Sequence, residues 1–199
     1  MPIITFTEVF DIIIMTLFVG FIFSDMVPAR REEDYDPLTH YSKWYNFEGL
    51  KTAVIATAPA IILHEMAHKF TALGFGLNAV FYAFYHNTFT LMLSLFTIIA
   101  KLTGFGFMFF VPGYVGISGQ GSQLEFAITA LAGPMVNLVL WVIPTLMIKF
   151  KKYMKKHLIY LLLTKRINGF LLIFNMLPIP GFDGSKFFTG LINHFAAVF

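Results

Sequence analysis

His64, Glu65 and His68 lie inside a run of apolar residues long enough to cross a membrane. Histidines four residues apart share one face of a helix, so both imidazoles can bind a single zinc ion. The intervening carboxylate can then reach a further ligand of that ion, usually water, and act as a base in hydrolysis. An ionisable group in the middle of a membrane helix costs roughly 2.5–3.5 kcal/mol on insertion scales. Three such groups so close together therefore indicate a functional site.

The composition is that of a membrane protein. Hydrophobic residues make up 57% of the 199 residues and charged residues 13%, and the mean hydropathy is +0.73, outside the range of soluble domains. The absence of cysteine excludes a disulfide framework, a thiolate nucleophile and a cysteine-based metal site. A net charge of +3 is too small and too scattered to indicate nucleic-acid binding. We expect one multi-pass integral membrane domain over residues 1–199, and the cysteine-free composition, rich in Ile, Phe and Lys, is typical of a prokaryotic cell membrane.

Apolar runs predict the spans that carry these residues. The first, Thr5–Phe23, can cross a bilayer of about 30 Å, with Glu8 and Asp11 near its start, at the interface. No basic segment or cleavage site marks it as a signal peptide, so we expect a retained span. Polar residues 24–48 then predict an exposed loop. Two further apolar runs, residues 49–76 and 123–148, predict membrane helices.

The segment between these two helices has a different pattern. Asn78–Tyr85 and Phe105–Ile117 are rich in aromatic and β-branched residues, and the second is rich in glycine, so both predict strands or an irregular hairpin. Thr88–Leu102 is apolar but of borderline length, and we expect a shallow or non-spanning helix. Five lysines in the segment 149–156 are typical of an interfacial anchor for lipid headgroups.

A catalytic zinc ion needs a third protein ligand, and the last apolar run, Ile167–Phe199, can supply it. Pro178 and Pro180 interrupt that run, because proline cannot continue a helix. Unwound backbone at membrane depth survives only where it is buried in protein or lines a wet cavity, so the break predicts a site at which Asp183 is presented. From Gly49 to His64 is 15 residues and from Ile167 to Asp183 is 16, so the two groups share one depth if both helices run the same way.

Together, HExxH in one apolar helix and N-x-x-P-x-P-x-x-D-G in a later one resemble the site-2 protease family of intramembrane zinc metalloproteases. The resemblance covers core segments 49–76, 123–148 and 167–186, and includes a G-P-x-x-N segment at 133–137. It implies zinc ligands and catalytic groups at named positions: His64, His68 and Asp183 as zinc ligands, Glu65 as general base and later acid, and Asn175 as a residue that steadies the substrate or the oxyanion. It also implies close helix packing at Gly133 and hydrogen bonding by Asn137.

The fold expected from these patterns is an all-α polytopic membrane protein with about four to six transmembrane helices. A membrane-embedded, β-like re-entrant segment and a broken helix at the metal site complete it. The resemblance implies that such a protein hydrolyses peptide bonds in or near transmembrane segments of membrane-protein substrates within the lipid bilayer. The edge of segment 105–117 could hold an unwound substrate by β-augmentation. Orientation stays open, because the lysine-rich loop predicts a cytoplasmic position and the resemblance an external one.

Other interpretations remain at this point. A non-enzymatic membrane metal-binding protein could be a metal carrier, which would need sites along a path, or a substrate-binding relic of a protease, which would be expected to lack Glu65. A membrane protease of prenylated peptides would use a glutamate as third ligand. Asp183 could also be only a helix N-cap, and Asn175 only a polar tie between helices. His86 is the one further histidine that lies near a predicted strand.

Overall fold

Helices dominate the residues that the computed structural model describes, which are 4–27, 47–104 and 111–197. Within these ranges, four helical segments are long and apolar enough to cross a membrane. They contain α1 (Phe6–Phe23), α3 (Phe47–Gly74), α5 (Gln123–Lys149) and α6 (Leu158–Asn175), and the shorter helices are α4 (Thr88–Leu102) and α7 (Asp183–Ala196). The expected all-α membrane fold is confirmed.

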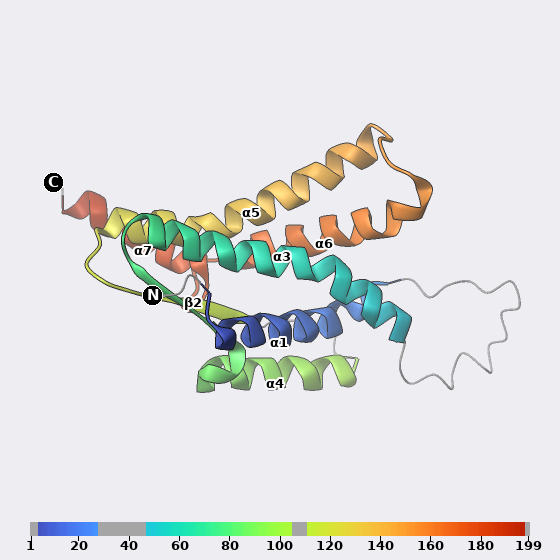
Figure 1. Cartoon of the computed structure of the whole chain (residues 1–199), viewed down its shortest axis with the longest axis horizontal. Helices are drawn as coiled ribbons and strands as arrows, with labels where there is room; N and C mark the ends of the chain where they lie inside the picture. The colour runs from blue at the N-terminus through green and yellow to red at the C-terminus, as the bar shows by residue number, and fades with distance from the viewer. Residues whose placement is uncertain (1–3, 28–46, 105–110, 198–199) are drawn as a thin grey trace, which may run out of the picture.

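Helix α3 lies between α1 on one side and α5 and α6 on the other, and α5 also contacts α6 and α7. Figure 1 shows that α3 and α6 run in the same direction and that α5 runs the opposite way. This is the parallel relation that the depth of the metal site requires. Helix α1 packs along α3, and their interface with α6 and the sheet forms the apolar core, which includes Met15, Val19, Phe23, Ile61, Phe81 and Ile167.

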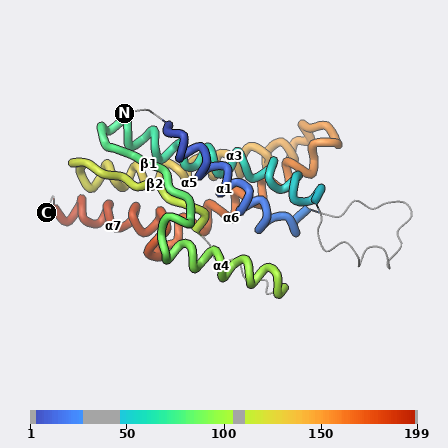
Figure 2. Tube along the Cα trace, turned by 60° about the horizontal axis from the view of Figure 1, so that its bottom comes forward, coloured from blue at the N-terminus to red at the C-terminus, as the bar shows by residue number. Residues whose placement is uncertain are grey.

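A two-stranded antiparallel sheet follows α3 and precedes α5. Strand β1 (Asn78–Ala83) pairs with β2 (Gly113–Ser118), in a register that runs from Asn78 opposite Ser118 to Ala83 opposite Gly113. The strands lie beside one another against α1 and α3 (Figure 2). The predicted hairpin-like pair is thus confirmed, with a helix at Thr88–Leu102 between its strands, although residues 105–110 of the second predicted strand lie outside the described residues.

The C-terminal region differs from the expected pattern at one point. Helix α6 begins at Leu158 rather than Ile167, and it runs through Lys165 and Arg166 without a break. Both are good helix formers, and their long side chains allow the methylene groups to lie on an apolar surface while the charge stays in water. The 16-residue count from Ile167 to Asp183 was therefore wrong as a helix length, because α6 ends at Asn175 and residues 176–182 are not helical.

Two acidic residues of α1 are buried inside the protein. Glu8 is 1% and Asp11 2% exposed. Glu8 accepts hydrogen bonds from Lys69 on α3 and from the Phe81 backbone N–H of β1. Asp11 accepts one from Tyr85 and lies 3.0 Å from His86. Partners that approach from β1 and α3 make burial possible, and partners so distant in the sequence could not be predicted from α1 alone. Most of the polar loop expected next, residues 28–46, lies outside the described residues.

Candidate metal centre

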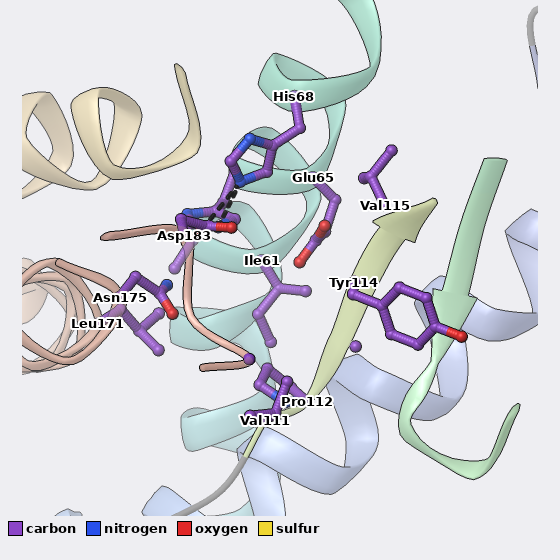
Figure 3. Close-up of a pocket in the computed structure, with 14 residues that line it drawn as sticks. Ile61, Glu65, His68, Val111, Pro112, Tyr114, Val115, Leu171, Asn175 and Asp183 are labelled. Atoms are coloured by element: carbon purple, nitrogen blue, oxygen red, sulfur yellow. Dashed lines mark hydrogen bonds and ion pairs between the residues drawn. The ribbon is translucent and has the colours of Figure 1, made fainter. Parts of the chain in front are cut away.

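Two ligand candidates on α3 and one at the start of α7 meet at a single point (Figure 3). The Nε2 atoms of His64 and His68 are 3.0 Å apart. Oδ2 of Asp183 lies 3.2 Å from the first and 3.1 Å from the second. Within the described part of the chain, these three residues form the one group of three or more histidine and acidic side chains able to hold a metal ion. The structure thus brings together the three residues that the sequence singled out.

The spacing of these three atoms fits a zinc ion. Ligands at about 2.0–2.1 Å from a tetrahedral zinc lie roughly 3.3 Å from one another. The Nδ1 atom of His68 is 2.7 Å from the backbone carbonyl of Thr129, which can only accept, so Nδ1 carries a hydrogen and the neutral form of the ring has its lone pair on Nε2. Two imidazole nitrogens and a carboxylate oxygen directed at one point are a donor set that zinc binds.

The position of Asp183 is consistent with this role. One oxygen of its carboxylate lies within 3.2 Å of both imidazoles, and a carboxyl group binds a metal ion in its ionised form. The N-cap of α7 is Phe182 rather than Asp183, so the alternative role of Asp183 as a helix cap is wrong.

The turn before α7 places Asp183 at the site. Pro178 and Pro180 end α6, and Gly181 has a φ of 101°, a left-handed conformation that favours glycine. Gly184 packs so closely on the segment just after α6 that a Cβ would lie 2.7 Å from the Leu177 carbonyl oxygen. The predicted broken helix is confirmed, and its tight return brings the carboxylate back to α3.

A pocket opens beside the three ligand candidates. It is lined by α3, by α6, by the turn before α7 and by the segment Val111–Val115, which includes the start of β2. Glu65, 5% exposed, directs its carboxylate into the gap between the ligand candidates and β2. Asn175 at the end of α6 lies on the opposite side of Asp183 (Figure 3). All five predicted site residues thus line one pocket.

Helix α5 supports the histidines from behind with residues four apart on one face. Thr129 offers its carbonyl to His68, and the Asn137 amide lies 3.0 Å from Nδ1 of His64. Between them, Gly133 is so close that a Cβ would lie 2.6 Å from the His64 Nε2 atom. The packing expected of Gly133 and the hydrogen bonding expected of Asn137 are confirmed. Thr129 was missed, because a backbone carbonyl leaves no signal in residue type.

Comparison with known proteins places the chain in a family. No protein-family model matches it, and no solved structure does. The chain is 33% identical over 183 residues to a protein of Methanocaldococcus jannaschii named "Putative zinc metalloprotease MJ0611", and the match covers 90% of this chain and 82% of the other. That name agrees with the cation-binding geometry of His64, His68 and Asp183 and supports zinc as the cofactor. The chain therefore belongs to the family of zinc metalloproteases that includes this M. jannaschii protein.

Proposed function

We propose that this protein is an intramembrane zinc endopeptidase of the site-2 protease type, which hydrolyses peptide bonds in or near transmembrane segments of other membrane proteins. The observation that carries the proposal is the position of the site. His64, Glu65 and His68 lie well inside α3, a helix of 28 residues that is long and apolar enough to cross a membrane. We expect the protein in a prokaryotic cell membrane, as its cysteine-free, apolar composition suggests.

Exposed apolar side chains on α3 support a site at membrane depth. Ile55, Leu63 and Phe70 are 47–52% exposed, and Leu63 is the neighbour of His64. Apolar groups of this size facing outward on both sides of the metal centre are favourable in lipid and costly in water. The helix therefore offers lipid one face and the pocket another.

The residues around the pocket can carry out the proton transfers of peptide hydrolysis. Zinc, when bound by the two histidines and Asp183, supplies a Lewis acid that polarises a carbonyl and lowers the pKa of water to about 7. Glu65 is the general base that takes a proton from the attacking water and then returns it to the leaving amine. Asn175, on the other side of the centre, can donate a hydrogen bond from its amide to the carbonyl oxygen as negative charge develops.

Strand β2 can hold the substrate. A transmembrane helix has its carbonyls engaged in internal hydrogen bonds, so it must unwind locally before hydrolysis. The sheet contains only β1 and β2 among the described residues, and β2 lies between β1 and Glu65, so its other edge faces the pocket (Figure 3). An extended segment paired to that edge by β-augmentation would lie between Glu65 and the strand.

The test compares wild type with Glu65→Gln and Asp183→Ala in detergent, with zinc content and cleavage of a helical membrane substrate as the two measurements. We expect Glu65→Gln to keep zinc and lose cleavage by roughly 10²–10⁴-fold, the size of a general-base contribution. Asp183→Ala should lose both, because two histidines alone do not hold a catalytic zinc. Glu125→Gln is the matched control, since Glu125 caps the start of α5, and it should leave both unchanged.

Each outcome separates the candidate functions. Cleavage that survives Glu65→Gln would rule out Glu65 as the base. Wild-type protein that binds zinc in stoichiometric amount but cleaves no membrane substrate would favour the non-enzymatic metal-binding alternative. Cleavage of the membrane substrate that is unaffected by complete removal of zinc would refute the proposal that the protein is a zinc endopeptidase.

A further inference from the structure

Asn137 has an unusual environment on α5. Its side chain is completely buried, and its amide nitrogen lies 3.0 Å from Nδ1 of His64. Its carbonyl oxygen Oδ1 has no hydrogen-bond partner, a situation shared only by Ser94 and Asn168 among buried side chains of the described residues. Buried polar atoms without a partner are rare and call for an explanation.

An Asn137 amide that donates a hydrogen bond to His64 is incompatible with metal binding. If the Asn137 N–H donates to Nδ1 of His64, that nitrogen must offer its lone pair, and the ring hydrogen then resides on Nε2. Nε2 is the atom that faces His68 and Asp183, so a hydrogen there excludes zinc. The oxygen and nitrogen of an amide have nearly the same shape, and turning the group by 180° exchanges them in place.

We propose that Asn137 accepts the Nδ1–H of His64 through its Oδ1 atom, and so holds the Nε2 lone pair toward zinc. This gives Oδ1 its missing partner and His64 the tautomer that ligation needs. The proposal rests on the zinc site of the proposed function and makes Asn137 a positioning residue, since it acts through His64.

The Thr129 carbonyl already plays this part for His68. Asn137 lies eight residues further along α5, on the same face, with Gly133 midway. One helix would thus supply a hydrogen-bond acceptor to the rear nitrogen of each zinc-binding ring, a backbone oxygen in one case and a side-chain oxygen in the other. Such acceptors fix the tautomer and raise the basicity of the ligand, and their loss typically lowers metal affinity roughly 10- to 100-fold.

Two substitutions of Asn137 distinguish an acceptor from a donor and from simple packing. Asn137→Leu keeps the approximate size and removes all hydrogen bonding, and we expect zinc affinity, measured by chelator competition on the full purified chain, to fall roughly 10- to 100-fold. Asn137→Asp keeps an acceptor and removes the donor, and it should stay within a few-fold of wild type. Asn168→Leu is the matched control, because Asn168 is equally buried but donates within its own helix, to the Thr164 carbonyl.

The opposite results would overturn the proposal. If Asn137→Asp lowered zinc affinity as much as Asn137→Leu, the native amide would be a donor. If Asn137→Leu lowered zinc affinity no more than Asn168→Leu, the Asn137 side chain would only fill space. Should Asn137→Asp not fold, ¹⁵N-histidine NMR spectra of the zinc-loaded protein provide the test. The proposal requires that the Nδ1 proton of His64 exchange slowly with solvent in wild type and fast in Asn137→Leu. A wild type that binds no zinc would instead refute the proposed function.

Discussion

Gly133 sets how closely α5 can approach the histidines. A Cβ at this position would lie 2.6 Å from Nε2 of His64 and nearer still to Nε2 of His68. Contacts that short do not occur between real side chains, so a methyl group here would have to displace the imidazoles or the helix. At the scale of single residues, the metal centre therefore depends on a position without a side chain as well as on its ligands.

Gly133→Ala should consequently impair zinc binding without removing any ligand. The methyl group occupies the space where the two Nε2 atoms converge, and a displacement of about 1 Å is enough to disable a preorganised site. We expect at least a roughly tenfold loss of affinity in chelator competition. Gly74→Ala is the control, because a Cβ at Gly74 meets nothing within 4 Å, and a similar loss there would show that the effect is not local.

At the scale of elements, one buried ion pair joins α1, α3 and β1. Glu8 on α1 and Lys69 on α3 are 1% and 3% exposed and form an ion pair. The same carboxylate accepts the backbone N–H of Phe81 on β1 and completes a capping box with Thr5. Because Lys69 follows His68 in the chain, this pair ties the sheet to the turn of α3 that carries the metal ligands.

Removal of one partner should destabilise the fold strongly. Lys69→Met leaves the Glu8 carboxylate buried without its counter-charge, which typically costs about 3–5 kcal/mol. We expect a loss of that size in the free energy of unfolding, measured by titration with denaturing detergent in mixed micelles. The double variant Glu8→Gln with Lys69→Met should recover part of it, because no uncompensated charge remains.

The pair formed by Lys101 and Asp25 serves as the comparison, since Asp25 is 76% exposed. Asp25→Asn should change the free energy of unfolding by less than about 1 kcal/mol. Equal losses in Lys69→Met and Asp25→Asn would contradict the structural role assigned to the buried pair.

Local sequence patterns predicted the helices and strands well, but they did not predict contacts between segments that are distant in the sequence. The histidine spacing and the two prolines near Asp183 act over a few residues, so they predicted both halves of the metal site. The strand pair also followed from local composition. The burial of Glu8 depends on partners 61 and 73 residues away, and the sequence of α1 carries no record of them. Hydropathy also misplaced the start of α6, because it cannot distinguish a basic helical turn from a loop.

At the scale of the whole molecule, α4 shows an orientation suited to lipid. Its buried positions are small or polar, namely Thr90, Ser94, Thr97 and Ala100, and its outward positions are large and apolar, namely Phe89, Met92, Leu95, Phe96, Ile99 and Leu102. A helix at a water-facing surface has the opposite arrangement. Helix α4 lies alongside α1 at the edge of the molecule (Figure 1), so its outer face extends the apolar surface of the four long helices.

The absence of cysteine makes this orientation testable, because one introduced cysteine is the only thiol in the chain. In liposomes with a charged, membrane-impermeant maleimide supplied on both sides of the bilayer, Met92→Cys should react far more slowly than Lys152→Cys, whose position is exposed in the lysine-rich segment after α5. The two should react equally once the protein is unfolded. Comparable rates in intact liposomes would mean that α4 faces water.

The third metal ligand also has a topological consequence, because His68 and Asp183 are 115 residues apart in the chain. An ion held by both would cross-link α3 to α7 and close a long loop, and such clips restrict the unfolded chain most when the loop is long. Without the ion, α7 would keep its packing against α5 and lose its tether to α3. Removal of the ion by a chelator should then detach α7 from α3 before the other helices unfold.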